Sequence, residues 1–328
     1  MSSASPTGVV ANGTGGVWRV IADDGTEYEA VLRGRLKKVD TGRRADGSIR
    51  RDTIAAAAAT AKLAVGDRVR LERDARQSAW AITDILPRKS RLARRAPGGG
   101  KGERVLAANL DQVIVMFAAA KPEPHPRMLD RFLVIAEAND LAARVVINKI
   151  ELVGDDVARE RFADYERAGY PVHFISVKQN VGLAEVEDAL AGQVSVVSGP
   201  SGVGKSSLLN ALFPGLGLQV SDISESVNKG KHTTVGAFLH PLPGDVGGAV
   251  VDTPGLREIG MWELPVLEVD RCFPEFRGLR DECRFSDCAH VAEPDCAVRA
   301  AVENNQVSRS RYDSYLKLRE ELEAEAPS

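Results

Sequence analysis

The sequence is poor in several features that would each place it in a particular class of protein. Aromatic residues make up only 5% of its 328 residues, so its cores must be built mainly from Val, Leu, Ile and Ala. No run approaches the roughly 20 apolar residues that a membrane-spanning helix requires. The N-terminus also lacks the charged start and apolar run of a secretory signal. We therefore expect a cytoplasmic protein without a membrane partner.

Cysteine is also scarce, and all four cysteines lie between Cys272 and Cys296. In a cytoplasmic protein, such a cluster favours metal binding over disulfide bonds. The pattern Cys283-x4-Cys288-x-His290-x5-Cys296 offers three thiolates and one imidazole, a complete tetrahedral set for one structural Zn²⁺. Ordinary buried cysteines are the alternative. Cys272 is left over, and we expect it to be buried.

The net charge is only −3, but it is unevenly distributed. Residues 31–104 contain 20 Lys and Arg against 8 Asp and Glu, a local net of +12, which leaves −15 for the rest of the chain. A basic block on an otherwise acidic chain suggests an anionic partner such as RNA. A solvated loop surface would give the same composition.

The N-terminal third predicts a small β-barrel. Residues 1–16 are rich in Gly, Ser and Thr and predict a disordered tail. Residues 17–104 hold short strand-like segments separated by Gly- and Asp-containing turns, which predict the barrel. The strands are expected at 17–21, 28–32, 67–71 and 80–86. We expect the basic stretch 37–51 and the Ala run 55–59 to form a long loop, or the Ala run to form a short helix. Residues 87–104, with Gly98–Gly100, predict a basic linker.

The rest of the chain predicts two further domains. In residues 105–262, apolar runs at 113–117 and 145–147 alternate with helical periodicity at 129–138. Strands that alternate with helices indicate an α/β domain with a largely parallel sheet. Residues 263–328 hold the cysteines and then a charged stretch, 309–325, that predicts a terminal helix.

Gly199 to Ser206 matches the phosphate-binding P-loop in full, between a strand at 194–197 and a helix that starts near Ser207. Its glycines let successive backbone N–H groups surround the phosphates. Lys205 would reach the β- and γ-phosphates, and the Ser206 hydroxyl would ligate Mg²⁺. The predicted nucleotide contacts here are Gly199, Ser201, Gly202, Val203, Gly204, Lys205, Ser206 and Ser207.

Two segments after the P-loop predict the rest of the phosphate and Mg²⁺ site. The strand 249–251 ends in Asp252-Thr253-Pro254-Gly255, where Asp252 would hold Mg²⁺ through water and the Gly255 N–H would sense the γ-phosphate. Upstream, Thr234 lies in the polar segment 230–234, which has the character of a switch loop. We expect Thr234 to complete the Mg²⁺ shell.

A base-reading motif favours GTP over ATP. Asn148-Lys149-Ile150-Glu151 follows the strand 145–147 and resembles the Asn-Lys-x-Asp motif of GTPases. The terminal carboxylate of that motif accepts hydrogen bonds from guanine, a pattern that adenine cannot supply. Glu151 departs from the motif by one methylene but offers the same acceptors. We also place Ser176 among the nucleotide-binding residues.

The order of these motifs is unusual, because the base-reading motif precedes the P-loop and the two switch segments follow it. A parallel sheet tolerates such a circular permutation when the old termini are joined and new ones open elsewhere. The second switch, after Gly255, then leads straight out of the domain. We therefore expect the following domain to anchor it.

Together these motifs closely resemble the bacterial ribosome small-subunit-dependent GTPase A family, also called RsgA or YjeQ. The resemblance runs from about Val17 to the C-terminal helix. It implies an N-terminal OB-fold, a circularly permuted GTPase domain and a zinc-binding helical domain. It also implies binding of GTP, GDP and the small ribosomal subunit with its rRNA, a role in late maturation of that subunit, and GTPase activity that the subunit stimulates. We expect a monomer.

Hydrolysis requires a group that orients the attacking water. Many GTPases use a Gln after the Asp-x-x-Gly motif, but Leu256 occupies that position here. His232 is the best polar candidate within the chain, and the family resemblance points to it as well. Two other functions are compatible with parts of the sequence: an ATP-dependent P-loop enzyme and a non-catalytic RNA-binding scaffold.

Overall fold

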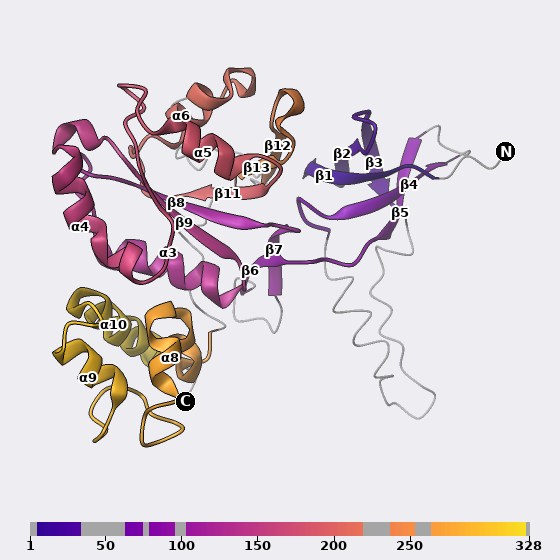
Figure 1. The fold of residues 1–328 in the computed structure, drawn as a ribbon. Coiled ribbons are helices and arrows are strands. Elements are labelled where there is room, and N and C mark those ends of the chain that lie inside the picture. The colour runs from indigo at the N-terminus through magenta and orange to yellow at the C-terminus, as the bar shows by residue number, and fades with distance from the viewer. Residues whose placement is uncertain are drawn as a thin grey trace, which may run out of the picture. The chain divides into compact units, whose positions relative to one another are not determined.

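The computed structural model describes residues 5–33, 63–74, 79–95, 103–218, 237–252 and 264–325 (Figure 1). Several sequence features lie outside these ranges. They are the basic stretch 37–51, the Ala run 55–59, Gly98–Gly100, and the switch residues His232, Thr234, Gly255 and Leu256.

The N-terminal strands form a closed barrel in the order β1-β2-β3-β5-β4. β3 pairs with β5 in parallel, whereas β1–β2, β2–β3, β4–β5 and β1–β4 pair antiparallel, which is the OB-type topology expected from the sequence. Small aliphatic side chains, among them Val10, Val20 and Leu71, fill the interior. The strands are β1 Thr7–Thr14, β2 Val17–Ala22, β3 Glu27–Leu32, β4 Arg68–Asp74 and β5 Ala79–Ile85.

The prediction of a disordered tail over residues 1–16 is wrong for β1. Val10 is fully buried in the barrel, so the strand contributes to the core. The glycines of β1, which suggested disorder, allow close packing instead. A Cβ on Gly8 would lie 2.5 Å from the Ile21 carbonyl oxygen, and one on Gly13 would lie 2.2 Å from the Trp18 ring.

The basic segment 87–104 is not only a linker. β6, Arg91–Arg95, pairs antiparallel with β7, Glu103–Ala108. Leu92, Ala107 and Ala108 are fully buried, and this burial stabilises the hairpin. The many arginines in the segment made it read as a linker in the sequence.

A six-stranded sheet in the order β10-β9-β8-β11-β13-β12 forms the centre of the α/β region. The pairs β10–β9, β9–β8 and β8–β11 are parallel, and β12–β13 is antiparallel. Every residue of β8 is buried, as expected for a central strand with both faces covered. The strands are β8 Gln112–Ala118, β9 Ala142–Asn148, β10 Val172–Phe174, β11 Val194–Ser198, β12 Phe238–Pro241 and β13 Ala249–Asp252.

Helices connect these strands as the alternating pattern predicted. The first begins at Pro126, a residue suited to the first helical turn because it has no N–H to leave unpaired. It buries Leu129, Phe132 and Leu133 at helical spacing. The helices are α3 Pro126–Ala138, α4 Asp155–Arg167, α5 Leu183–Leu190 and α6 Lys205–Leu212, with 3-10 turns η1 Ile150–Leu152, η2 Pro214–Leu216 and η3 Gly244–Val246.

The C-terminal segment is a small helical unit that packs on α3 (Figure 1). Phe273, Phe276 and Tyr315 form its aromatic centre, with ring centroids 5.1 to 5.6 Å apart. The terminal helix covers the predicted residues 309–325. Its elements are η5 Val266–Cys272, η6 Pro274–Phe276, α8 Arg277–Arg280, α9 Ala297–Glu303 and α10 Arg309–Glu325. Among the described residues, no helix is both long and apolar enough to cross a membrane.

Candidate nucleotide site and metal centre

Four loops leave the carboxyl ends of the parallel strands β8, β9, β10 and β11. They begin at Ala119, Lys149, Ile175 and Gly199. Ligands of open α/β sheets bind outside this edge, where strand order reverses. Here β8 and β11 are neighbours in the centre of the sheet. β8 comes before the base-reading motif in the chain, and β11 leads into the P-loop. The sheet therefore brings the P-loop and the base-reading motif to one edge.

The P-loop follows a path that only glycine permits at two positions. Gly199 has φ 143°, and a Cβ there would lie 1.9 Å from the Met116 carbonyl oxygen. Gly204 has φ 102°, and a Cβ there would lie 2.5 Å from Asn148 Nδ2. The glycines thus let the loop approach the neighbouring strand and the base-reading motif closely.

Asn148 holds two loops together through its side-chain amide. Its Nδ2 donates to the Val203 carbonyl at 2.8 Å, and its Oδ1 accepts from the Val177 N–H at 3.1 Å. The side chain is buried, so these main-chain contacts satisfy its amide in a dry environment. Asn148 therefore connects the P-loop to the loop that carries Ser176.

Lys149 joins the P-loop to a further loop. Its Nζ donates to the carbonyls of Gly202 and Lys121. Its backbone adopts φ 64°, in the left-handed region that non-glycine residues seldom occupy. The sharp turn after β9 directs the amine back toward the P-loop.

Lys205 and Ser206 occupy the first turn of α6, directly after Gly204. Both side chains are buried. The Lys205 amine donates to the Gly199 carbonyl at 2.9 Å and the Pro200 carbonyl at 2.7 Å. Val203 is buried as well, whereas Ser201 and Gly202 are exposed and Ser207 is half-buried. The start of α6 adds the partial positive charge of a helix N-terminus to that of Lys205.

Glu151 and Ser176 lie in the two loops that flank the base side. Glu151 is half-buried in η1, and its Oε2 is buried without a hydrogen-bond partner among the described residues. Ser176 is fully buried, and its Oγ accepts from the Gln179 N–H at 3.1 Å. A buried carboxylate oxygen without a donor requires a partner.

Asp252 ends β13, as the sequence suggested, and is half-buried. The segment after it and the segment before β12 are outside the described residues. The expected positions of His232, Thr234 and Gly255 therefore stay predictions.

Sequence reasoning missed Lys121 and Val177 as parts of this site. Both contribute main-chain groups, the Lys121 carbonyl to Lys149 and the Val177 N–H to Asn148. Main-chain contacts leave no residue-type signature. Their position directly after strands β8 and β10 was the only available signal.

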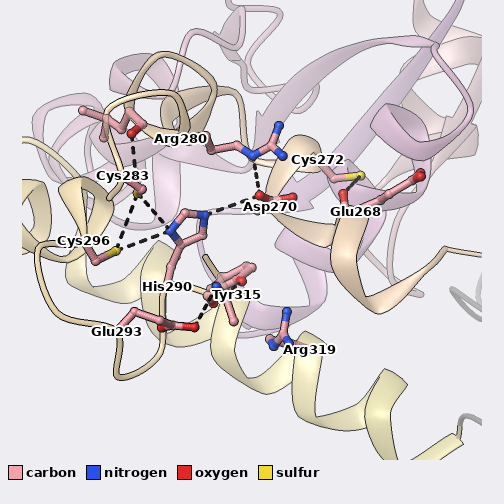
Figure 2. Close-up of polar contacts among 12 residues, drawn as sticks. Glu268, Asp270, Cys272, Arg280, Cys283, His290, Glu293, Cys296, Tyr315 and Arg319 are labelled. Carbon is pink, nitrogen blue, oxygen red and sulfur yellow. Dashed lines mark hydrogen bonds and ion pairs between the residues drawn. The ribbon is translucent and has the colours of Figure 1, made fainter. Parts of the chain in front are cut away.

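The predicted metal ligands converge in the C-terminal unit, and Figure 2 shows three of them, Cys283, His290 and Cys296. One ligand atom from each of Cys283, Cys288, His290 and Cys296 lies within 4.8 Å of all the others. His290 Nδ1 is 3.6 Å from Cys283 Sγ and 3.4 Å from Cys296 Sγ, and these two sulfurs are 4.0 Å apart. Tetrahedral zinc with Zn–S near 2.3 Å and Zn–N near 2.0 Å requires separations of about 3.5 and 3.8 Å. The donor set and its spacing therefore fit such an ion.

Asp270 orients the imidazole from behind. Its Oδ2 lies 3.4 Å from His290 Nε2 and also accepts from Arg280 Nε (Figure 2). Burial alone would raise the pKa of Asp270, but the contacts with His290 and Arg280 outweigh it, and the net direction is downward. An ionised carboxylate behind the ring holds the proton on Nε2, which leaves Nδ1 as the ligand atom.

The chain around His290 is held by the terminal helix and by Glu293. Tyr312 Oη donates to the His290 carbonyl at 2.6 Å, and Tyr315 Oη donates to the Ala289 carbonyl at 2.7 Å. Glu293 accepts from three backbone N–H groups, which outweigh its desolvation and lower its pKa to about 2. The two tyrosine contacts fix the metal loop to α10, and the Glu293 contacts hold the loop to itself.

Cys272 lies apart from the cluster. It is buried, and its Sγ contacts the Glu268 carbonyl at 3.8 Å (Figure 2). Burial raises the pKa of its thiol to about 12, so the thiolate is not formed near neutral pH. The prediction that Cys272 is a buried, leftover cysteine is confirmed.

Comparison with known proteins gives one consistent result. A family model described as RsgA GTPase matches residues 85–262. A protein of Gemmatimonas aurantiaca named small ribosomal subunit biogenesis GTPase RsgA is 57% identical over 321 residues, which cover 98% of each chain. A Bacteroides fragilis protein of the same name is 36% identical, over 96% of this chain and 97% of its own.

Two solved structures share the whole fold. YjeQ from Thermotoga maritima aligns with a TM-score of 0.75 at 33% identity, covering 97% of this chain and 98% of its own. YloQ, described as a circularly permuted GTPase, aligns with a TM-score of 0.70 at 27% identity, covering 99% and 97%. The permuted motif order and the three-part fold inferred from the sequence are therefore confirmed.

Proposed function

The chain belongs to the RsgA GTPase family and is a GTP hydrolase, and from this premise we propose that it acts in late maturation of the small ribosomal subunit, which stimulates its turnover. Its relatives are named for the biogenesis of that subunit. The assignment carries with it a cytoplasmic location, binding to rRNA and a monomeric state.

The observation that carries the nucleotide assignment is the interlocking of the P-loop with the base-reading motif. Asn148 and Lys149 both bind carbonyls of the P-loop. These contacts hold the loop proposed to bind the phosphates at a fixed position relative to the motif proposed to bind the base. In this proposal the loop from Gly199 to Ser207 surrounds the phosphates. The Lys205 amine exchanges its carbonyl partners for phosphate oxygens when nucleotide binds.

Guanine selectivity is assigned to Glu151. Its unpartnered buried oxygen would accept hydrogen bonds from guanine, whereas adenine lacks the matching donors. Ser176, in the loop after β10, would support the base side. The alternative of an ATP-dependent enzyme would leave the Glu151 carboxylate facing the adenine amino edge without the paired donors that it needs.

Mg²⁺ would be held by Ser206 and Thr234, with Asp252 acting through water. It would neutralise charge that develops on the phosphate oxygens. His232 is proposed to orient the attacking water, because Leu256 has no group that can hydrogen-bond. Lys205 would stabilise the transferred phosphoryl group. The presence of Lys205, Ser206 and Asp252 together argues against a non-catalytic scaffold.

The metal of the C-terminal cluster is proposed to be one structural zinc ion. Cys283, Cys288, His290 and Cys296 complete a four-coordinate set, which leaves no position for substrate. The ion would hold the loop between α8 and α9 against α10. It has no part in the hydrolysis.

The proposed RNA surface is the basic block of residues 31–104. Among its described residues, Arg70 and Arg73 project as exposed side chains from β4. Trp80 is partly buried against the barrel core and contacts Tyr28 edge-on at 4.5 Å, so neither ring is a free stacking platform. These features favour contacts with phosphates of structured RNA over reading of bases.

Multiple-turnover phosphate release tests the proposal. We expect slow hydrolysis of GTP by the protein alone, strong acceleration by purified small ribosomal subunits, and none by large subunits. His232→Ala should lose most of the acceleration and little GTP affinity. Equal turnover with and without small subunits would contradict the assigned partner, and equal use of ATP and GTP would contradict the guanine assignment.

A further inference from the structure

Arg311 of α10 is the largest fully buried side chain of the described residues. Its Nη1 donates to Asp130 Oδ1 of α3 at 2.6 Å. Its Nε and Nη2 donate to the two Glu275 oxygens at 2.7 and 3.1 Å. The guanidinium carbon also lies 4.7 Å from the Phe273 ring centroid and 5.6 Å from that of Tyr165. One charged group therefore joins the C-terminal unit to α3 and α4.

Stability alone does not explain such a group. Desolvation of a buried ion pair often cancels its attraction, and well-packed apolar side chains of similar volume serve as well or better. The pairing is also incomplete. Asp130 Oδ2 and Ser314 Oγ are buried without hydrogen-bond partners among the described residues. Two carboxylates face one guanidinium, and burial raises the pKa of the Asp130 carboxyl despite the nearby Arg311.

The junction connects to the base side of the proposed nucleotide site through one short segment. Tyr165, whose ring lies beside Arg311, donates through Oη to the Pro126 carbonyl at 3.4 Å, at the start of α3. The residues just before α3 form the loop that supplies the Lys121 carbonyl to Lys149. Arg161 of α4 lies one turn before Tyr165. Its Nη1 donates a hydrogen bond to the Ala119 carbonyl at 2.9 Å, at the start of that loop. A continuous series of packed and hydrogen-bonded groups thus runs from Arg311 to Lys149.

We propose that Arg311 is a positioning residue that couples the C-terminal helical unit to the guanine side of the nucleotide site, so that the placement of that unit sets the rate of GDP release. The inference rests on the proposed nucleotide site. Because coupling is reciprocal, GDP in the site must in turn stabilise the attachment of α10 to α3. A macromolecule that binds the C-terminal unit would then control nucleotide exchange without touching the nucleotide.

Dissociation of a fluorescent GDP analogue from the full chain, followed by stopped flow, is the first measurement. Arg311→Met preserves much of the apolar volume but removes the charge. We expect dissociation to change by about 5- to 150-fold, the usual range of coupling between sites. Lys317→Met is the matched control on the same helix, because among the described residues Lys317 pairs with Glu320 in the next turn; its rate should equal that of the parent. A rate within twofold of the parent in folded Arg311→Met would overturn the proposal.

Hydrogen exchange of residues 309–325 provides a readout that a purely structural role would not change. GDP should slow exchange of this helix in the parent and in Lys317→Met, but not in Arg311→Met. If Arg311→Met does not fold, Asp130→Asn removes the partner charge at nearly constant volume and should show the same loss of GDP protection. GDP that binds the parent without protecting α10 would refute the coupling, whereas failure of the parent to bind GDP would refute the nucleotide site itself.

Discussion

The nucleotide loops bring together residues from separate parts of the chain, whereas the metal ligands all lie within residues 283–296, and different forces hold the two sites. In the nucleotide site, Asn148 and Lys149 bind main-chain groups at the ends of hydrogen-bonded strands. In the metal centre, three thiols and an imidazole approach one another within a segment that has little regular structure. The first arrangement is stabilised by the sheet, and the second, in our proposal, by a cation.

This difference determines what each site requires. The P-loop keeps its shape through glycine geometry and carbonyl contacts, so loss of a catalytic side chain should leave the loop intact. Buried thiols without a metal are neutral and attract one another little, whereas zinc converts them into charged ligands. Loss of a metal ligand should therefore change the local structure as well as the binding.

Lys205→Ala should have the largest effect, because it removes the charge that the P-loop is proposed to direct at the phosphates. We expect phosphate release to fall by at least about 1,000-fold. The melting temperature should stay close to that of the parent, because the loop's other contacts are independent of this amine. Near-normal turnover in the folded variant, with Lys317→Met as reference, would remove the P-loop from the mechanism.

The second largest effect is expected from removal of zinc by a chelator or from Cys283→Ser. The purified parent should contain about one zinc per chain, and the variant little. The loss should cost about 3 kcal/mol, which corresponds to a melting temperature lower by about 6–12 °C. Hydrogen exchange should increase over residues 283–296 and remain unchanged over 199–206.

Cys272→Ala is the matched control, since Cys272 is a buried cysteine outside the cluster. Its zinc content should equal that of the parent. Freshly purified parent protein that contains no metal, or a Cys272 variant that loses it, would contradict the ligand assignment.

Glu151→Gln should have a smaller effect, limited to the choice of base. Replacing a charged acceptor by an amide should reduce the preference for GDP over ADP by about 10- to 100-fold, as expected for hydrogen bonds to a charged group. Calorimetry with the two nucleotides measures it. Glu151→Asp keeps the charge and should retain the preference. If Glu151→Gln discriminates as well as the parent, another group reads the base.

Tyr312→Phe should have the smallest effect. It removes the hydroxyl that binds the His290 carbonyl at 2.6 Å but keeps the ring. We expect a loss of about 1–2 kcal/mol with zinc content unchanged, measured by chemical denaturation. A variant that loses its zinc would show that this hydroxyl is essential to the metal loop. It would contradict the view that the four ligands alone determine metal binding.

The sequence could predict the elements whose signal is local. The P-loop, the strands beside it and the Cys-His spacing are contained in short windows, and the barrel strands β2 to β5 follow from alternation. Composition misled the sequence analysis at two places. The Gly-, Ser- and Thr-rich start predicted disorder where β1 forms, and the basic, Gly-rich segment 87–104 predicted only a linker where β6 and β7 pair. Gly8 and Gly13 suggested disorder, but the structure places them where close packing excludes any Cβ.

By itself, then, the sequence determined the permuted order of the motifs and predicted the chemistry of this protein: which residues would hold phosphate, guanine and zinc. Only the tertiary structure decided what supports them. Asn148 reaching the Val203 carbonyl, Asp270 behind His290, and Arg311 between Asp130 and Glu275 all join positions far apart in the chain. Periodicity reports whether a residue is buried, but its partner depends on how the sheet and helices pack, and main-chain partners carry no residue type at all.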